Sequence, residues 1–338
     1  MHKILMASVG ILLLLSGCSS HDLSKGRAFS LSERSFSDLK GWEDDNIREA
    51  MPALIRSCHK ATGGWRSFCQ GLQGYRFSSA AKIRSYLEDN LQPYAVTAYG
   101  TENGKITGYY EAELTGTRTQ VRETQVPVYG VPRGYRNGDK LETREDIEDT
   151  ENYAPIIAWA DDPVELFILH IQGSGRMQTP TGEIKLGYAG NNGRTFKALS
   201  QILRDEGIKP SGGYSMPAMK KWLQDNPKKA RRLMAENPRY IFFKEVQGDS
   251  PYGSAGVVLT PKRSVAVDKN YIPMHTPLWL ETKTPSGEKL NQLVVAQDVG
   301  NAITGGIRAD FFWGHGEEAF NNAGRMNSRG KYYLLLPK

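Results

Sequence analysis

The segment 294–314, which reads VVAQDVGNAITGGIRADFFWG, restricts the fold more than any other part of the chain. It holds two aspartates, Asp298 and Asp310, inside one short glycine-rich stretch. The apolar run Leu293–Ala296 at its start predicts a buried strand. The glycines that follow let the backbone turn where side chains would clash, so Asp310 is expected just beyond a loop.

The residues around Asp310 suggest acid chemistry. The apolar, aromatic run 311–313 follows directly, and such neighbours raise the pKa of a carboxyl group by removing water from it. A carboxylic acid that stays protonated near neutral pH can donate a proton to a substrate. The alternative is structural: Asp298 would bond backbone N–H groups in a turn, and Asp310 would cap the end of a strand.

A third acid, Asp268, lies between two strand-like runs in the segment 256–280. This three-aspartate pattern resembles the C-terminal domain of the membrane-bound lytic murein transglycosylase A family, whose motif has a second Asp about a dozen residues after the first. Further blocks that resemble the family occur in family order at Thr107–Tyr110, Gln172–Gly175, Tyr188–Gly190 and Phe242–Lys244.

The resemblance implies a mainly β protein in two parts. Residues 33–111 and 245–338 would form one discontinuous double-psi β-barrel domain that carries the catalytic Asp. Residues 112–244 would form an inserted, smaller, mixed β/α domain, and the substrate groove would lie between the two. In the inserted part, the residues themselves predict short strands at 126–129, 156–159 and 166–171, followed by helices.

The resemblance also implies an activity on peptidoglycan glycan strands. A lytic murein transglycosylase cleaves the β-1,4 bond between MurNAc and GlcNAc and leaves a 1,6-anhydromuramic acid end. In this chemistry Asp310 would act first as acid and then as base, with Asp298 supporting the site and Asp268 serving the structure. Two alternatives remain: a water-using glycoside hydrolase with Asp298 and Asp310 as a pair, and a non-catalytic wall-binding barrel.

Candidate substrate-binding residues come from the blocks that resemble the family. Aromatic rings stack on the apolar faces of sugars and hydroxyl groups bond to them, so the block at 107–110 suits a carbohydrate groove, whereas without the resemblance an ordinary core strand would be favoured. Loops at 172–175 and 188–191 would supply the second wall. The candidates are Thr107, Tyr109, Tyr110, Gln172, Gly173, Ser174, Gly175 and Tyr188.

The N-terminus predicts export and lipidation. Residues 1–18 combine His2 and Lys3 with a short apolar core and the ending Leu-Ser-Gly-Cys, which is typical of a lipoprotein signal peptide cleaved before Cys18. Residues 19–32 would then be a tether. Ser19, in place of an aspartate, resembles lipoproteins passed on to the outer membrane, so we expect a lipid-anchored protein at its periplasmic face. The alternative is an ordinary secreted protein.

The remaining cysteines, Cys58 and Cys69, favour a local disulfide in an oxidising compartment. Two buried free thiols are the alternative. A metal site is less favoured because His59 stands beside Cys58 without a second cluster of ligands.

The net charge and the motifs of the chain limit which binding partners and cofactors are expected. The formal charge of +6 favours an anionic partner, and the export signal makes nucleic acid an unexpected one. Cell-wall synthesis or hydrolysis proteins are candidate protein partners. None of the six histidines has the spacing of a zinc motif and no nucleotide loop is found, so we expect no metal and no cofactor.

At four places the sequence leaves the role of the residues open, and only the structure can decide it. The sequence at Ser79–Lys82 matches the Ser-x-x-Lys motif of serine enzymes, although a helix N-cap at Ser78 or Ser79 explains it better. Glu111 and Arg308 are charged neighbours that would change the pKa of a catalytic carboxyl group. Asn301 replaces the second glycine of the family motif.

Overall fold

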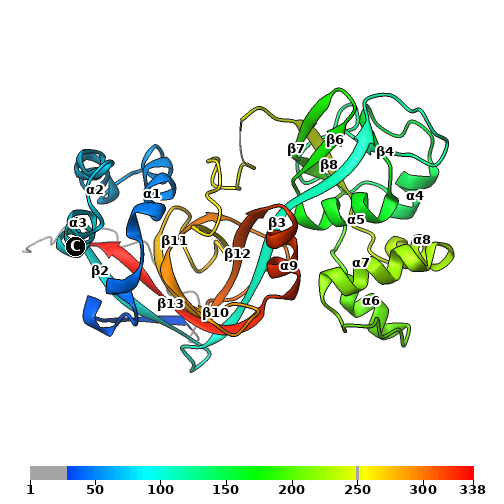
Figure 1. Ribbon diagram of the computed structural model, residues 1–338. Helices are drawn as coiled ribbons and strands as arrows, with labels where there is room; N and C mark the ends of the chain where they lie inside the picture. Colours follow the sequence, from blue (N-terminus) through cyan, green and yellow to red (C-terminus); the bar gives the residue numbers. More distant parts are fainter. Residues whose placement is uncertain (1–28, 249–250) are drawn as a thin grey trace, which may run out of the picture.

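The computed structural model describes residues 29–248 and 251–338 (Figure 1). The helices are α1 (Met51–Cys58), α2 (Trp65–Leu72), α3 (Ala80–Asn90), α4 (Arg144–Asp149), α5 (Pro163–Gln172), α6 (Leu199–Asp205), α7 (Met216–Asp225), α8 (Pro227–Ala235) and α9 (Glu317–Arg325). The strands are β1 (Phe29–Glu33), β2 (Leu91–Ala98), β3 (Gly104–Thr117), β4 (Val126–Tyr129), β5 (Ile156–Ala160), β6 (Gly175–Thr179), β7 (Gly182–Asn191), β8 (Ile241–Glu245), β9 (Ser264–Val267), β10 (Pro277–Lys283), β11 (Lys289–Asp298), β12 (Arg308–His315) and β13 (Asn327–Pro337). The predicted signal peptide and Cys18 lie outside the described residues.

Six strands close into a ring. They pair in the order β13, β10, β11, β9, β12 and β3, and β3 pairs back with β13. Side chains alternate between the two faces of each strand, as in Leu278 and Leu280 inside against Trp279 outside. Because both faces are covered, the ring strands read as nearly continuous apolar runs. This explains why Leu293–Ala296 is apolar throughout.

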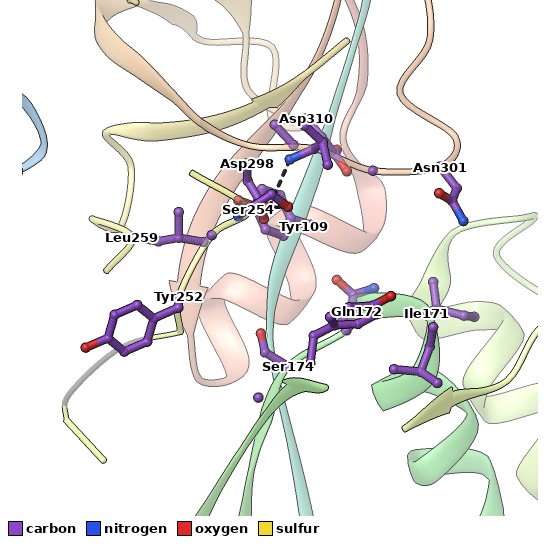
Figure 2. Close-up of a pocket in the computed structure, with 18 of the residues that line it drawn as sticks. Tyr109, Ile171, Gln172, Ser174, Tyr252, Ser254, Leu259, Asp298, Asn301 and Asp310 are labelled. Atoms are coloured by element: carbon purple, nitrogen blue, oxygen red, sulfur yellow. Dashed lines mark hydrogen bonds between the residues drawn. The ribbon is translucent and has the colours of Figure 1, made fainter. Parts of the chain in front are cut away.

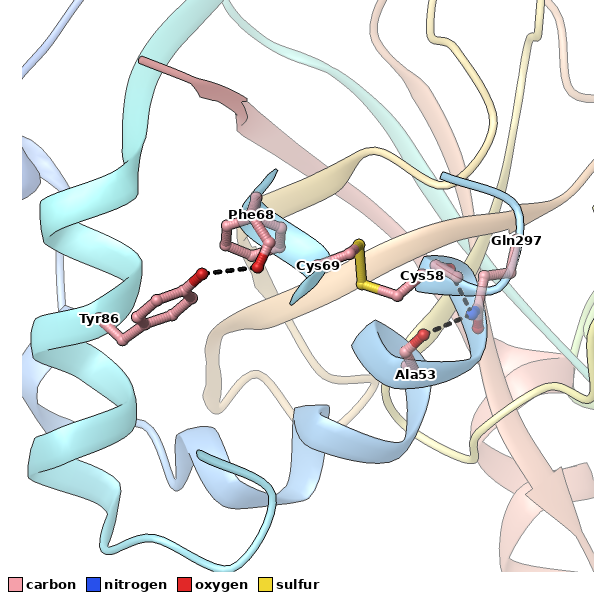
Figure 3. Close-up of a disulfide and its surroundings, with 7 residues drawn as sticks. Ala53, Cys58, Phe68, Cys69, Tyr86 and Gln297 are labelled. Atoms are coloured by element: carbon pink, nitrogen blue, oxygen red, sulfur yellow. Dashed lines mark hydrogen bonds between the residues drawn. A yellow bond between two sulfur atoms is a disulfide. The ribbon is translucent and has the colours of Figure 1, made fainter. Parts of the chain in front are cut away.

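Helices α1, α2 and α3 cover the outer face of the ring, and their buried side chains join Trp279 and Val295 in one core. Figure 3 shows Cys58 and Cys69 joined in a disulfide between α1 and α2, the pairing that the sequence favours. Nearby, the Gln297 amide donates to the Ala53 carbonyl at 2.9 Å and the Ser57 hydroxyl at 2.8 Å. These bonds fix the end of β11, one residue before Asp298.

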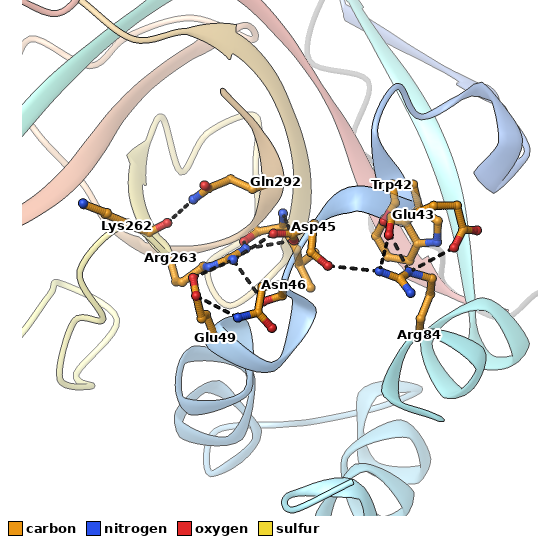
Figure 4. Close-up of polar contacts among 10 residues, drawn as sticks. Trp42, Glu43, Asp45, Asn46, Glu49, Arg84, Lys262, Arg263 and Gln292 are labelled. Atoms are coloured by element: carbon orange, nitrogen blue, oxygen red, sulfur yellow. Dashed lines mark hydrogen bonds and ion pairs between the residues drawn. The ribbon is translucent and has the colours of Figure 1, made fainter. Parts of the chain in front are cut away.

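A buried ion pair ties the N-terminal region to the start of β9 (Figure 4). Arg263 donates to both oxygens of Asp45, at 2.8 and 2.9 Å, and to Glu49 at 3.0 Å. The Arg263 and Asp45 side chains are 3% and 4% exposed. A bidentate pair fixes distance and orientation together, so β9 has a defined position beside the site.

The middle of the chain forms a second body around β6, β7 and β8, with β4 and β5 beside them and α4–α8 packed around (Figure 1). Strand β3 belongs to both bodies. Its residues 105–109 pair with β12 in the ring, and its residues 112–115 pair with β6. This shared strand helps to set how the two bodies face each other, together with the packing of α7 against α9. The mainly β prediction agrees with this mixed sheet.

The structure corrects the assignment of one predicted strand and the predicted end of the tether. Residues 166–171 are not a strand but part of helix α5, which Asp162 caps by accepting from the Val164 N–H at 2.8 Å, with Pro163 in the first turn. The predicted tether ends early, because its last residues, 29–32, pair with β2 as part of β1.

One further expectation concerns the start of a helix. The N-cap at Ser79 is confirmed: its hydroxyl accepts from the Lys82 backbone N–H at 3.4 Å. The Ser-x-x-Lys motif therefore begins helix α3 and has a structural explanation. No helix in the described part of the chain has both the length and the apolar character needed to cross a membrane.

Candidate active site

A groove of about 960 Å³ lies between the ring and the second body. Figure 2 shows Asp298 and Asp310 on one side of it and Ile171, Gln172 and Ser174 on the other. Its walls come from β3, β8 and β12, from the end of α5 and from the loop after β11. A groove between two bodies suits an extended ligand such as a polymer strand.

Asp310 is placed by the pairing of two strands. Strand β12 runs parallel to β3, and Asp310 lies opposite Thr107 in the register. The Thr107 hydroxyl donates to Oδ1 of Asp310 at 2.5 Å. Within residues 29–248 and 251–338, this is the only hydrogen bond to the Asp310 side chain. Its second oxygen is therefore left for a ligand in the groove.

Burial raises the pKa of Asp310, and the neighbouring charge of Asp298 adds to the effect. The Arg308 guanidinium and the Thr107 hydrogen bond act in the opposite direction but do not reverse it. The Arg308 guanidinium donates to the backbone carbonyls of Ala309 at 2.6 Å and Lys105 at 3.4 Å, and forms no ion pair with Asp310 within the described residues. Asp310 thus has the character of a proton donor.

Asp298 has a different environment. Its Oδ1 accepts from the N–H and hydroxyl of Ser254 and from the Val299 N–H, each at 2.9 Å, and its Oδ2 accepts from the Tyr109 hydroxyl at 3.1 Å. Burial raises the pKa of Asp298, and these hydrogen bonds oppose the rise. Both oxygens are already occupied by protein donors, so Asp298 is suited to orient the site.

Asp268 supports the loop between the two other aspartates. Its Oδ1 accepts from the Asn270 backbone and side chain at 3.0 Å, and its Oδ2 accepts from the Gly305 N–H at 2.8 Å. The side chain is buried and does not line the groove. This placement agrees with the structural role expected for it.

Most of the predicted substrate-binding residues line the groove: Tyr109, Gln172, Gly173, Ser174 and Tyr188. Thr107 does not line the groove itself but contacts Asp310 from behind through its hydroxyl group. The predictions for Tyr110 and Gly175 need correction, because neither lines the groove. Tyr110 points to the other face of β3 and packs against Phe320 with ring centroids 5.3 Å apart. Gly175 is buried where β6 meets β3, and an added Cβ would lie 2.6 Å from the Ala112 carbonyl oxygen.

The charge of Glu111 is neutralised by an ion pair with Arg176, outside the groove. Arg176 donates to Glu111 at 2.7 Å, and both side chains are buried. Burial raises the pKa of Glu111 and the Arg176 contact opposes this. Glu111 does not line the groove that holds Asp310.

Several groove residues have no signal in the sequence. Ser254, which binds Asp298, lies in a short segment without a motif, and the groove lining also includes Phe196, Arg239 and Tyr252. Tyr252 is 57% exposed, and its ring lies at the groove lining. Among the described residues, no group of three or more His, Cys, Asp or Glu could hold a metal ion.

Comparison with known proteins gives consistent matches. Residues 105–244 match the MltA specific insert domain, and residues 263–336 match the 3D domain. The membrane-bound lytic murein transglycosylase A of Escherichia coli (strain K12) is 30% identical over 266 residues, covering 73% of this chain and 71% of that protein.

The solved structures that are similar to this one include MltA proteins as well. MltA from Neisseria gonorrhoeae, in a monoclinic form, has a TM-score of 0.82 and 29% identity, covering 92% of this chain and 94% of that chain. E. coli MltA with bound chitohexaose has a TM-score of 0.73 and 26% identity, covering 92% and 95%. The ring, the groove and these relatives together define a lytic transglycosylase class. The chain belongs to the membrane-bound lytic murein transglycosylase A family.

Proposed function

We propose that this protein is a peptidoglycan lytic transglycosylase that cleaves the β-1,4 bond between MurNAc and GlcNAc with one aspartate. Asp310 protonates the glycosidic oxygen as the bond breaks and positive charge develops at the anomeric carbon. The C6 hydroxyl of the same MurNAc then attacks that carbon, and Asp310 accepts the hydroxyl proton. The product is a 1,6-anhydromuramic acid end, and no water is consumed.

The observation that carries this proposal is the contrast between the two groove carboxyl groups. Burial raises the pKa of both carboxyl groups, but Asp310 receives one described hydrogen bond, whereas Asp298 accepts four through both oxygens. A retaining or inverting hydrolase needs a second carboxylate free to attack carbon or activate water. Asp298 is instead suited to stabilise developing positive charge and to orient Tyr109.

The finer fold assignment is part of the proposal. The six-strand ring would be a double-psi β-barrel built from residues 33–111 and 245–338, with residues 112–244 as the inserted domain. The matches to an insert domain and to a 3D domain support this division. The groove residues Tyr109, Gln172, Gly173, Ser174 and Tyr188 would bind the glycan, with Thr107 acting at the site through its hydrogen bond to Asp310. The chitohexaose held by the E. coli relative supports a β-1,4-linked ligand.

We also propose that a lipid on Cys18 anchors the protein at the periplasmic face of the outer membrane. The relatives are named membrane-bound, and no described helix could span a membrane. The signal sequence supplies the anchor chemistry, since a lipidated cysteine needs no spanning helix.

Replacement of Asp310 by Asn tests the proposed function. An amide can still accept the Thr107 hydrogen bond but cannot transfer a proton, so release of fragments from purified sacculi should fall by about 100-fold or more. Glycan binding and the unfolding temperature should be retained, and Asp298→Asn should reduce activity less. Asp225→Asn, on the surface of α7 beside Lys221, serves as the matched control. More than about a tenth of wild-type activity in Asp310→Asn would contradict the assignment.

A further inference from the structure

Arg239 lies two residues before β8, on the groove wall opposite the aspartates. Across from it is Asn301, in the loop between Asp298 and Asp310. Figure 2 shows the Asn301 side chain pointing away from both aspartates and toward the ribbon of the second body. With its amide turned so that the oxygen faces the guanidinium, that oxygen lies 2.9 Å from Nε, 2.7 Å from Nη1 and 2.7 Å from Nη2 of Arg239.

The position of Arg239 is fixed from behind by a buried network. Arg144, whose side chain is 1% exposed, donates to the Arg239 carbonyl at 2.7 Å and to the Asn237 carbonyl at 3.1 Å. The Arg144 guanidinium also lies over the rings of Phe167 and Tyr240. Arg239 itself donates to the Arg194 carbonyl at 3.2 Å. A guanidinium held in this way is preorganised to bind a ligand.

The charge of Arg239 is not neutralised by the protein. Within the described part of the chain, no carboxylate lies in ion-pair distance of Arg239, and the same holds for Lys244, which lines the same wall. The neighbouring Glu245 is engaged by Arg118 through two hydrogen bonds, at 2.9 and 3.1 Å. Burial lowers the pKa of Arg239 without a carboxylate to oppose it, although a guanidinium stays charged at neutral pH. This wall of the groove is therefore cationic.

We propose that Arg239 recognises a carboxylate carried by the glycan strand, so that this groove selects an anionic polysaccharide over a neutral one. The inference rests on the proposed function, because a MurNAc-containing strand carries carboxylates where a chitin strand has none. The planar guanidinium matches the two oxygens of a carboxylate. In the free protein the Asn301 amide oxygen contacts the Arg239 guanidinium, and a bound carboxylate would displace that contact.

Binding measurements on the full chain carrying Asp310→Asn, which cannot turn over the ligand, test this proposal. Three glycans of equal length are compared: a neutral chitin oligomer, a peptide-free MurNAc-GlcNAc oligomer with lactyl carboxylates, and the same oligomer with stem peptides. Arg239→Gln should reduce affinity for the carboxylated glycans relative to chitin by about tenfold or more, the range of a charge-assisted hydrogen bond. A loss on the peptide-free oligomer assigns the lactyl carboxylate, and a loss only on the peptide-bearing one assigns the stem peptide.

Matched variants separate charge recognition from damage to the groove. Arg231→Gln removes the same charge from the exposed face of α8, where Arg231 pairs with Asp149, and should leave the affinity ratio unchanged. Asn301→Gly removes the competing oxygen and should strengthen carboxylate binding. An equal loss for all three glycans, or no loss, in Arg239→Gln would overturn the inference. If wild-type protein cleaves sacculi but Arg239→Gln leaves the ratio of affinities for carboxylated glycans and chitin unchanged, only this inference fails. If wild-type protein releases no fragments from sacculi, the proposed function fails.

Discussion

At the scale of single residues, the hydrogen bond from Thr107 is one of the contacts that moderate the pKa of Asp310, which burial raises. The Thr107 hydroxyl stabilises the charged carboxylate and so lowers its pKa, against the rise caused by burial. Thr107→Val keeps the shape but removes the donor, so the pKa of Asp310 should rise further. The alkaline limb of the pH–rate profile, where the acid loses its proton, should move to higher pH, and the maximal rate should fall by about tenfold as positioning is lost.

The control for this prediction is Thr107→Ser, which retains the hydroxyl and should keep the wild-type profile. A profile that moves to lower pH in Thr107→Val, or that does not move, would show that this hydrogen bond has no part in tuning the acid.

Residue-level prediction from sequence worked where a physical pattern was local. The aromatic run behind Asp310 indicated a desolvated carboxyl group, and its pKa is raised by burial. Tyr110 was misplaced because its block was treated as one unit; alternation along a strand puts Thr107 and Tyr109 on one face and Tyr110 on the other. Ser254 could not be predicted, since its contact with Asp298 joins positions 44 residues apart.

At the scale of elements, strand β3 holds the site together, because its first half pairs in the ring and its second half pairs with β6. Gly175→Ala tests the junction. The new Cβ would meet the Ala112 carbonyl oxygen at 2.6 Å and a Leu169 methyl group at 2.4 Å. Such overpacking should lower the free energy of unfolding by about 1–3 kcal/mol in denaturant titrations.

Gly74→Ala is the matched control, since no atom lies within 4 Å of its added Cβ. Its stability should stay within about 0.5 kcal/mol of wild type. Equal stability of the two variants would mean that close packing at the β3–β6 junction is not required.

Helix α5 shows why elements were harder to predict than motifs. Its residues Val164 and Leu166–His170 are all buried, so no polar face reveals a helical period. A short apolar run cannot be assigned to helix or strand from periodicity alone, and Asp162-Pro163 was the decisive local signal. By contrast, the capping serine Ser79 marked the start of α3 correctly.

At the scale of the whole molecule, the resemblance to the family predicted a mainly β protein with a groove between two parts, and the ring and the second body have such a groove between them. Ring closure could not be predicted from the residues, because the pairing of β3 with β13 joins Gly104 to Gly330, across most of the chain. Periodicity identifies strands, whereas their order depends on contacts between distant segments.

The proposed anchor makes a prediction for the whole protein. Cys18→Ala should leave a protein that is exported or unprocessed but no longer fractionates with outer membranes, because the lipid is the only lasting membrane attachment in the proposal. The measurement is membrane fractionation with immunodetection. A correctly exported Cys18→Ala protein that still fractionates with outer membranes would show that another surface anchors it.

The central claim is that Asp310 works without water as a reactant, and digestion of purified sacculi in heavy-oxygen water tests it most directly. Mass analysis of the fragments reports the chemistry of each new end. The proposed mechanism predicts 1,6-anhydromuramic ends, one water lighter than a hydrolysis product, with no heavy oxygen incorporated. Reducing muramic ends that carry the heavy oxygen would contradict it and would assign the groove to a water-using hydrolase.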